Sequence, residues 1–165
     1  MIKLRAFTEA ELPIAAILHE LDTPEKIEKF RPRFEATGRW DDHYFNCAVE
    51  VDGVVVGEVQ ARHCPKSMPP GTAEMGLDLL PEFRGKGLGT RILSVLAHQL
   101  FAEGYHRLAG STDVTNIAMQ RAFDKAGWKY EGTQRHLMPE GEDLPHDYRM
   151  YAITKFDEIP AVSAE

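Results

Sequence analysis

A glycine-rich segment with two cations carries the clearest chemistry in this chain. It reads Arg84-Gly85-Lys86-Gly87-Leu88-Gly89-Thr90 and stands between an apolar stretch and an amphipathic one. The first amides of a helix lack partners within the helix and lie at its positive end, and glycine removes the side chains that would keep a ligand away from the backbone. Residues 84–90 therefore predict a loop that binds a pyrophosphate at the start of a helix.

The spacing of these glycines separates three kinds of phosphate loop. A Walker A loop is excluded because Lys86 lies between glycines and no hydroxyl residue follows it directly. A dinucleotide fingerprint would need glycine in place of Thr90. The remaining pattern is Arg-x-x-Gly-x-Gly, which resembles the acetyl-CoA loop of the GNAT superfamily of N-acetyltransferases.

A second segment resembles the same family. Asn116-Ile117-Ala118-Met119 opens a helical stretch that ends at Gly127-Trp128. Two short strands are expected after it, one at Tyr130–Thr133 with Glu131-Gly132 and an aromatic-rich one around Asp147–Tyr151. Family members place an Asn at this helix start against the pantetheine arm and usually close the helix with Gly-Phe, which is Gly-Trp here. The resemblance extends from Leu4 to Thr154 and is most specific from Glu74 to Gly132. It is greatest to the ribosomal-protein N-terminal acetyltransferases (the RimJ/RimL-like branch), and the second half also resembles aminoglycoside 6′-N-acetyltransferases.

The resemblance implies acetyl-CoA as co-substrate and a set of residues that contact it. Lys125 would approach the ribose phosphate, although a lysine there also suits a helix C-terminus. The expected contacts are Leu79, Leu80, Arg84, Gly85, Lys86, Gly87, Leu88, Gly89, Thr90, Asn116, Met119, Phe123 and Lys125.

The family's reaction moves an acetyl group directly from the thioester to a primary amine. The amine must lose a proton, and the acidic Glu74 and Asp78 share one face of an otherwise apolar strand at Ala73–Leu80. Either carboxylate could equally lie at the strand's solvated margin. Family members often carry a Glu at the position of Glu74 and the aminoglycoside enzymes an Asp on this strand, so the resemblance implies that Glu74 acts as base through a water and that Asp78 holds the substrate ammonium. We expect the backbone N–H of Leu79 to stabilise the oxyanion.

The usual general acid is missing. Family members often use a Tyr where this chain has Phe123, and the ribosomal-protein branch often uses a Ser where it has Met119. Possible substitutes are Tyr130, Tyr148, His136 and Thr115, each of which is more readily explained by a structural role.

The acceptor amine is less well defined. An acidic, aromatic segment could line the binding site of a cationic acceptor, or could be an ordinary solvated loop. Its residues are Trp40, Asp41, Asp42 and Tyr44. Family acceptor sites also use the segment around Arg135 to Asp147. The formal charge of −7 argues against nucleic acid and weakly favours a cationic acceptor. A small-molecule amine and a protein N-terminus both stay open.

The elements that position these residues alternate along the chain. Strand Ile2–Phe7 and helices from Glu11 to Leu21 and from Pro24 toward Phe34 precede a hairpin of Phe45–Val51 and Val54–Arg62, which Asp52-Gly53 joins. The strand Ala73–Leu80 should pair in parallel with Arg107–Thr112 through the helix that begins at Leu88. The predicted fold class is α/β, a three-layer GNAT-type fold. A mixed, mostly antiparallel sheet has helices on both faces and a splayed parallel pair that forms the acetyl-CoA cleft.

Composition fits one domain. The chain has 165 residues, of which 43% are hydrophobic, and we expect a single domain over 1–156 with a frayed tail over 157–165. No apolar run approaches the roughly 20 residues of a membrane span, and the N-terminus is not secretory. These two observations suggest a cytoplasmic protein without a membrane partner. Two cysteines without metal-ligand spacing fit a reducing compartment and predict no metal and no disulfide. A homodimer is possible.

Three functions fit these patterns in decreasing order. The first is an acetyl-CoA-dependent N-acetyltransferase. The second is an acyl-CoA-binding regulatory or structural module without turnover, which the missing Tyr and Ser would explain. A phosphotransferase that binds ATP at the glycine loop fits least, because the sequence has no recognisable set of metal-binding carboxylates.

Overall fold

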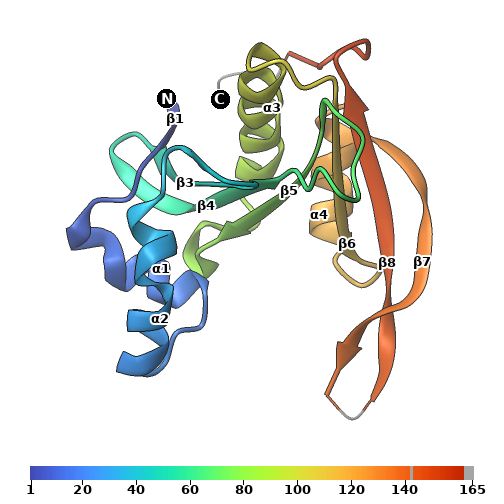
Figure 1. The fold of residues 1–165 in the computed structure, drawn as a ribbon. Coiled ribbons are helices and arrows are strands. Elements are labelled where there is room, and N and C mark those ends of the chain that lie inside the picture. Colours follow the sequence, from blue (N-terminus) through green and yellow to red (C-terminus); the bar gives the residue numbers. More distant parts are fainter. Residues whose placement is uncertain (142, 162–165) are drawn as a thin grey trace. The chain divides into compact units, whose positions relative to one another are not determined.

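A computed structural model describes residues 1–141 and 143–161 of the chain (Figure 1). The chain divides into two units: unit 1 comprises Met1–Ser67 and Met75–Arg84, and unit 2 comprises Met68–Glu74 and Gly85–Glu165. Strand β5 (Thr72–Leu79) belongs to both, because its first three residues lie in unit 2 and the others in unit 1.

Unit 1 combines two helices with antiparallel strands. Its strands follow the order β1-β3-β4-β5, and β2 pairs with β3 outside that order. The elements are β1 (Ile2–Arg5), a 3-10 turn (Glu9–Glu11), α1 (Leu12–Leu18), α2 (Pro24–Glu35), β2 (Trp40–Asp41), β3 (Tyr44–Val51), β4 (Val54–Arg62), the second part of β5 and a 3-10 turn (Pro81–Phe83).

The predicted hairpin is confirmed. Asp52 and Gly53 have φ values of 50° and 86°. Two left-handed residues in a two-residue loop form a type I′ turn, which matches the twist of the strands that it joins. Val51 and Val54 are paired directly beside the turn, and the pairing continues to Tyr44 opposite Arg62.

The register of β4 and β5 brings polar residues onto one face. Leu80 N donates to Val56 O at 3.0 Å, and Gly57 lies against Asp78 and Leu79. A Cβ at Gly57 would lie only 2.1 Å from Asp78 O, so this close approach needs glycine. Glu58 on β4 therefore lies opposite Asp78 on β5, and the next pair on the same face is Gln60 and Gly76.

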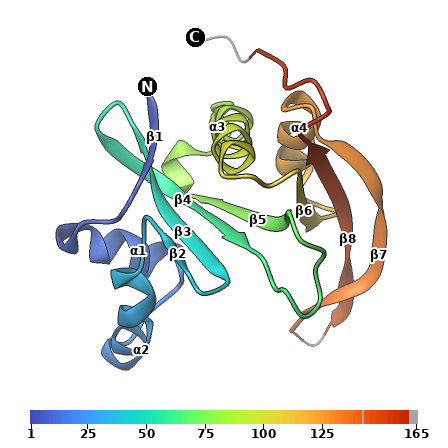
Figure 2. The same cartoon turned by 45° about the horizontal axis from the view of Figure 1, so that its top comes forward.

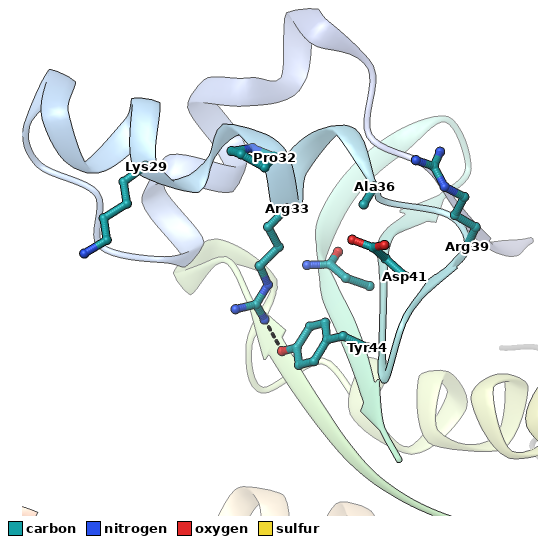
Figure 3. Close-up of a pocket in the computed structure, with 8 residues that line it drawn as sticks. Lys29, Pro32, Arg33, Ala36, Arg39, Asp41 and Tyr44 are labelled. Atoms are coloured by element: carbon teal, nitrogen blue, oxygen red, sulfur yellow. Dashed lines mark hydrogen bonds between the residues drawn. The ribbon is translucent and has the colours of Figure 1, made fainter. Parts of the chain in front are cut away.

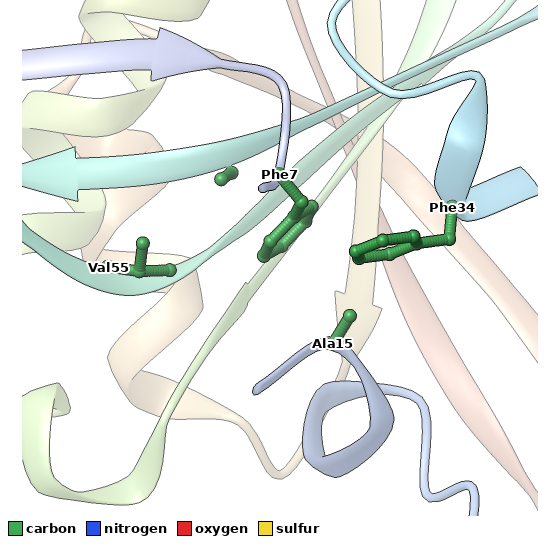
Figure 4. Packing of buried hydrophobic residues seen from close by; sticks show 5 residues of the cluster. Phe7, Ala15, Phe34 and Val55 are labelled. Carbon is green, nitrogen blue, oxygen red and sulfur yellow. The ribbon is translucent and has the colours of Figure 1, made fainter. Parts of the chain in front are cut away.

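The helices of unit 1 cover a small aromatic core (Figure 4). Phe7 and Phe34 lie with ring centroids 5.9 Å apart, next to Ala15 of α1 and Val55 of β4. All four side chains are buried, together with Ala48 of β3. This core holds α1 and α2 against the sheet of unit 1 and so positions the ends of both helices.

Local signals define where these helices begin and end. Thr8 N donates to Glu11 Oε2 at 2.8 Å, as capping-box spacing predicts, and Thr23 Oγ1 accepts from Lys26 N at the start of α2. The first helix is shorter than the predicted Glu11–Leu21. It ends at Leu18, because Glu20 adopts a left-handed φ of 53° and stops the helical backbone.

Unit 2 contains the parallel strand pair and two neighbouring helices (Figure 2). Its strands follow the order β5-β6-β8-β7, and β5 runs parallel to β6 over Thr72–Glu74 opposite Arg107–Ala109. No helix among the described residues is long and apolar enough to cross a membrane. The elements are the first part of β5, α3 (Leu88–Ala102), β6 (Arg107–Asp113), α4 (Ile117–Lys125), β7 (Lys129–Glu140) and β8 (Asp143–Thr154).

The last two strands are longer than predicted. The sequence suggested short strands at residues 130–133 and 147–151 with a turn segment between them, whereas β7 and β8 have 12 residues each. His136 has φ 52°, and its N–H donates to Asp147 Oδ1 at 2.7 Å. The pairing shifts register along the hairpin, so the sequence there lacks the regular alternation of apolar and polar residues that identifies a strand.

The start of the predicted tail is attached to β7 and β8. Asp157 accepts hydrogen bonds from Thr154 N at 2.8 Å and from Lys129 Nζ at 2.6 Å. These contacts hold the pKa of Asp157 at about 2, with the Lys129 hydrogen bond as the largest cause. Residues 162–165 lie outside the described part of the chain.

Replacing Asp157 with Asn is expected to lower the thermal stability at pH 7. A carboxylate whose pKa is lowered by folding stabilises the native state above its unfolded pKa near 4, and the contribution disappears as the pH falls toward 2. The Tm difference between the parent protein and Asp157→Asn should therefore shrink from pH 7 to pH 2.5. A difference that stays constant over this range would contradict the assignment.

Candidate active site

The glycine loop leads directly into α3, as the sequence predicts. Gly85 and Gly87 both have φ 72°, and Gly87 is the N-cap of α3. Such values favour glycine, and a Cβ at either position would meet no atom within 4 Å. Residues 84–87 are exposed. The first amides of α3 therefore follow an accessible loop whose shape depends on its glycines.

Arg84 holds the end of β5. Leu80 N bonds to β4, and successive residues of an antiparallel strand point their backbone groups to opposite sides, so the N–H and C=O of Leu79 point away from β4. Arg84 Nε donates to Leu79 O at 2.9 Å. The N–H of Leu79, which is the predicted oxyanion donor, therefore points away from β4. Arg84 holds the same residue in place through its carbonyl oxygen.

Asp78 and Glu58 form a carboxylate pair across β4 and β5. Directly opposed residues of an antiparallel pair have Cβ atoms about 5 Å apart. The side chain of Glu58 has no exposed surface, whereas Asp78 is exposed. Partial desolvation raises the pKa of Asp78, and the charge of Glu58 raises it further. A carboxylate with a raised pKa beside a second one suits proton transfer or the binding of an ammonium group.

A hydrogen-bonded chain supports Glu58. His19 Nε2 lies 2.9 Å from each oxygen of Glu58, and Gln60 Nε2 donates to Oε1 at 2.5 Å. An ionised carboxylate only accepts hydrogen bonds, so the tautomer of His19 with its proton on Nε2 can donate to Glu58. Gln60 Oε1 in turn accepts from the hydroxyl of Tyr44 at 2.7 Å. These contacts compensate the buried charge of Glu58.

Glu74 and Asp78 occupy different parts of β5. They share a face of the strand, but four residues of strand separate them by about 13 Å. Glu74 is half-buried and lies opposite Ala109 in the parallel pair. The predicted base and the predicted ammonium ligand therefore lie apart on β5, and Glu58 is the carboxylate that lies opposite Asp78 on β4.

The predicted contacts on α4 have mixed surroundings. Asn116 is the N-cap of α4, and its Oδ1 accepts from Met119 N at 3.1 Å. Phe123 is fully buried, and its ring stacks on Tyr151 with centroids 4.8 Å apart. Lys125 is exposed in the last turn. Asn116 and Lys125 keep groups that a ligand can reach, while Phe123 occupies a core position.

The substitutes for a general acid have structural partners. Tyr130 is hydrogen-bonded to Thr133 Oγ1 at 2.8 Å, and the guanidinium of Arg149 lies 4.3 Å from its ring centroid. Thr115 donates to Asp113 Oδ1 at 2.8 Å. Tyr148 is half-buried and His136 is exposed. These contacts explain Tyr130 and Thr115 without a catalytic role.

The acidic, aromatic segment predicted to line the acceptor site is part of unit 1. Trp40 and Asp41 form β2, and Asp42 turns the chain back into β3 with φ 53°. The ring centroid of Trp40 lies 5.6 Å from that of Phe45. Asp41 and Tyr44 line a cavity of about 370 Å³ together with Asn46 of β3. The other lining residues come from α2 and the segment that follows it: Lys29, Pro32, Arg33, Ala36 and Arg39 (Figure 3).

Sequence reasoning missed several polar residues of unit 1, namely His19, Arg33, Asn46, Glu58 and Gln60. Glu58 and Gln60 lie in the apolar stretch Val54–Ala61, which is the same signal that singled out Asp78. The pairing of His19 with Glu58 joins residues 39 positions apart, so no local pattern predicts it. Within residues 1–141 and 143–161, no group of three or more His, Cys, Asp or Glu side chains could hold a metal ion.

Solved structures with the same fold include three acetyltransferases, each compared over 93% or more of both chains. The ribosomal-protein α-N-acetyltransferase RimL in complex with coenzyme A has a TM-score of 0.76 at 18% identity, covering 93% of each chain. The spermidine N-acetyltransferase from Vibrio cholerae in complex with CoA and spermine has a TM-score of 0.76 at 17% identity, and the comparison covers 93% of this chain and 95% of that one. The ribosomal-protein-S18-alanine N-acetyltransferase from Escherichia coli has a TM-score of 0.67 at 17% identity, and the comparison covers 100% of this chain and 98% of that one.

The family assignment rests on the sequence of the chain's central part. Comparison with curated proteins finds no match. The family model described as "Acetyltransferase (GNAT) family" matches residues 14–128, which contain the glycine loop, the Asp78–Glu58 pair and the start of α4. The chain belongs to the acetyltransferase (GNAT) family of N-acetyltransferases.

Proposed function

We propose that this N-acetyltransferase binds the pyrophosphate of acetyl-CoA at residues 84–90 and transfers the acetyl group to an amine held by Asp78. The single observation that carries the proposal is the exposed loop at the start of α3, in which Gly85 and Gly87 have left-handed backbones. Amides at the positive end of a 15-residue helix bind phosphate oxygens, and Lys86 adds charge.

The other expected acetyl-CoA contacts fit in part. The Oδ1 of Asn116 caps α4, which leaves its Nδ2 as the group that donates to the pantetheine arm. Met119 is half-buried one turn into the same helix, and Lys125 is exposed at its end. Phe123 supports this surface from the core. When bound, the thioester supplies the acetyl group and a thiolate leaving group.

Asp78 binds the acceptor ammonium and accepts its proton. A lysine-like amine with a pKa near 10.4 is neutral in only about one molecule in 2,500 at pH 7, so deprotonation limits the attack. The raised pKa of Asp78 makes it a better base than an ordinary aspartate, and the buried charge of Glu58 attracts the cation. Glu74 remains an alternative base farther along β5.

The backbone and solvent complete the reaction. The N–H of Leu79 points away from β4 and donates to the carbonyl oxygen of the acetyl group as that oxygen becomes negative. Arg84 fixes this part of the strand through Leu79 O. Thiols have a pKa near 8.5, so the thiolate leaves with a proton from water and needs no tyrosine.

The proposal is tested by thiol release from acetyl-CoA in the presence of primary amines. Amine-dependent release would support acetyl transfer. Binding of acetyl-CoA without thiol release in the presence of any small amine or N-terminal peptide would instead favour the non-catalytic acyl-CoA module.

We also propose that the protein is cytoplasmic and forms a homodimer, which sedimentation would detect.

Glu58→Gln is expected to move the acid side of the pH–activity profile to lower pH. Glu58 raises the pKa of Asp78, and glutamine keeps its shape without the charge. Asp78 would then stay ionised, and active, in more acidic solution. The measurement is kcat/KM for an amine between pH 5 and 9, with Glu82→Gln at an exposed position as control. An acid limb that stays in place or moves to higher pH would count against the pair.

A further inference from the structure

The cavity beside α2 has a cationic lining. Arg33, Lys29 and Arg39 line it together with one carboxylate, that of Asp41. Arg33 extends toward Tyr44 and donates to its hydroxyl, with the guanidinium carbon 4.0 Å from the ring centroid (Figure 3). The stacking holds the guanidinium in place and leaves other N–H groups for a ligand. The volume of about 370 Å³ lies within the range of small-molecule sites, about 300–1,000 Å³.

Asn46 gives independent support for a ligand. It lines the cavity, only 3% of its surface is exposed, and neither Nδ2 nor Oδ1 has a hydrogen-bond partner. Buried amides in proteins are almost always hydrogen-bonded, so this one lacks both an acceptor and a donor. A carboxylate beside an N–H or hydroxyl would supply both, and the same carboxylate pairs with Arg33.

The sheet relates this cavity to Asp78. Asn46 lies opposite Gln60, and Gln60 lies opposite Gly76, two residues before Asp78 on the same face. Two strand spacings and two residues along the strand amount to about 12 Å between the backbones at Asn46 and Asp78. Tyr44, Gln60 and Glu58 join the two places through hydrogen bonds.

We propose that the cavity binds the carboxylate end of the acceptor, so that the substrate is an amino-carboxylate such as an amino acid or short peptide. The inference rests on the proposed function, because it places the amine of that molecule at Asp78. A diamine or polyamine is disfavoured, since its second ammonium group would meet three cations and one carboxylate.

Matched pairs of probes test the proposal. The probes are L-lysine with cadaverine, and triglycine with triglycine amide, which differ in the carboxylate alone. Calorimetric titration in the presence of CoA should show that L-lysine and triglycine each bind at least tenfold more tightly than the partner without a carboxylate. Arg33→Gln and Asn46→Leu should abolish that preference, whereas Lys26→Gln, which changes an exposed cation of the same helix, should keep it. The leucine has space in the cavity, and Arg33 is exposed, so both variants should fold.

The same pairs, measured by thiol release, separate the two proposals. Carboxylate-dependent binding without thiol release would support the cavity as a carboxylate site and would contradict the proposed acetyl transfer. Equal release from both members of each pair, unchanged in the two cavity variants, would support the transfer and overturn the amino-carboxylate. Absence of binding by all four probes, or tighter binding of cadaverine and triglycine amide, which lack the carboxylate, would also overturn it.

Discussion

Asp78→Asn is expected to lower kcat/KM for an amine by about 10²-fold or more while acetyl-CoA still binds, because general base catalysis contributes about that much. Asparagine has nearly the same shape but neither attracts an ammonium nor accepts its proton. The measurement is thiol release under initial-rate conditions, together with a calorimetric titration of CoA. Glu74→Gln is the matched comparison on the same face of β5.

The same variant should be more stable than the parent protein at pH 7. Folding raises the pKa of Asp78, so the ionised carboxylate costs stability above that pKa, and asparagine removes the cost. The gain should disappear below the unfolded pKa near 4, where both states are protonated. Unchanged activity in Asp78→Asn together with a large loss in Glu74→Gln would transfer the base to Glu74.

Gly87→Ala is expected to weaken acetyl-CoA binding by about tenfold or more, which corresponds to about 1.4 kcal/mol. The φ of 72° at Gly87 strains any residue with a Cβ, and relaxation of this strain would move the amides at the start of α3. The measurement is the Kd for acetyl-CoA by calorimetric titration.

Gly53→Ala is a close control for this effect. Gly53 has φ 86° in the β3–β4 turn, and a Cβ there meets no atom within 4 Å, as at Gly87. Both variants should lose about 1 kcal/mol of stability. Equal Kd values for the two would mean that the loop does not bind the cofactor.

The fold was largely predictable where one local signal decides the backbone. Asp52-Gly53 predicted the hairpin, and the glycines of residues 84–90 predicted the start of α3. The fold class also follows from the order of the elements. The long β7–β8 hairpin was missed, because register shifts and Pro139 and Pro145 remove the alternation that identifies strands.

The candidate site was predictable only in part. The glycine loop and Asp78 stand out by residue type, since a carboxylate in an apolar strand needs an explanation. The role of Glu58 depends on its position opposite Asp78, and the cavity depends on α2 packing near Asn46. Such long-range contacts have no sequence period, so neither Glu58 nor the cavity can be predicted from a local pattern.

Thermal unfolding with and without acetyl-CoA, CoA, ATP and NADH tests the central claim most directly. A ligand that binds only the native state adds about 2.7 kcal/mol of stability at a hundredfold excess over its Kd. We expect acetyl-CoA and CoA to raise the Tm, and ATP and NADH to leave it nearly unchanged. No shift with either CoA compound, or a larger shift with ATP, would contradict the assignment of residues 84–90 as the acetyl-CoA loop.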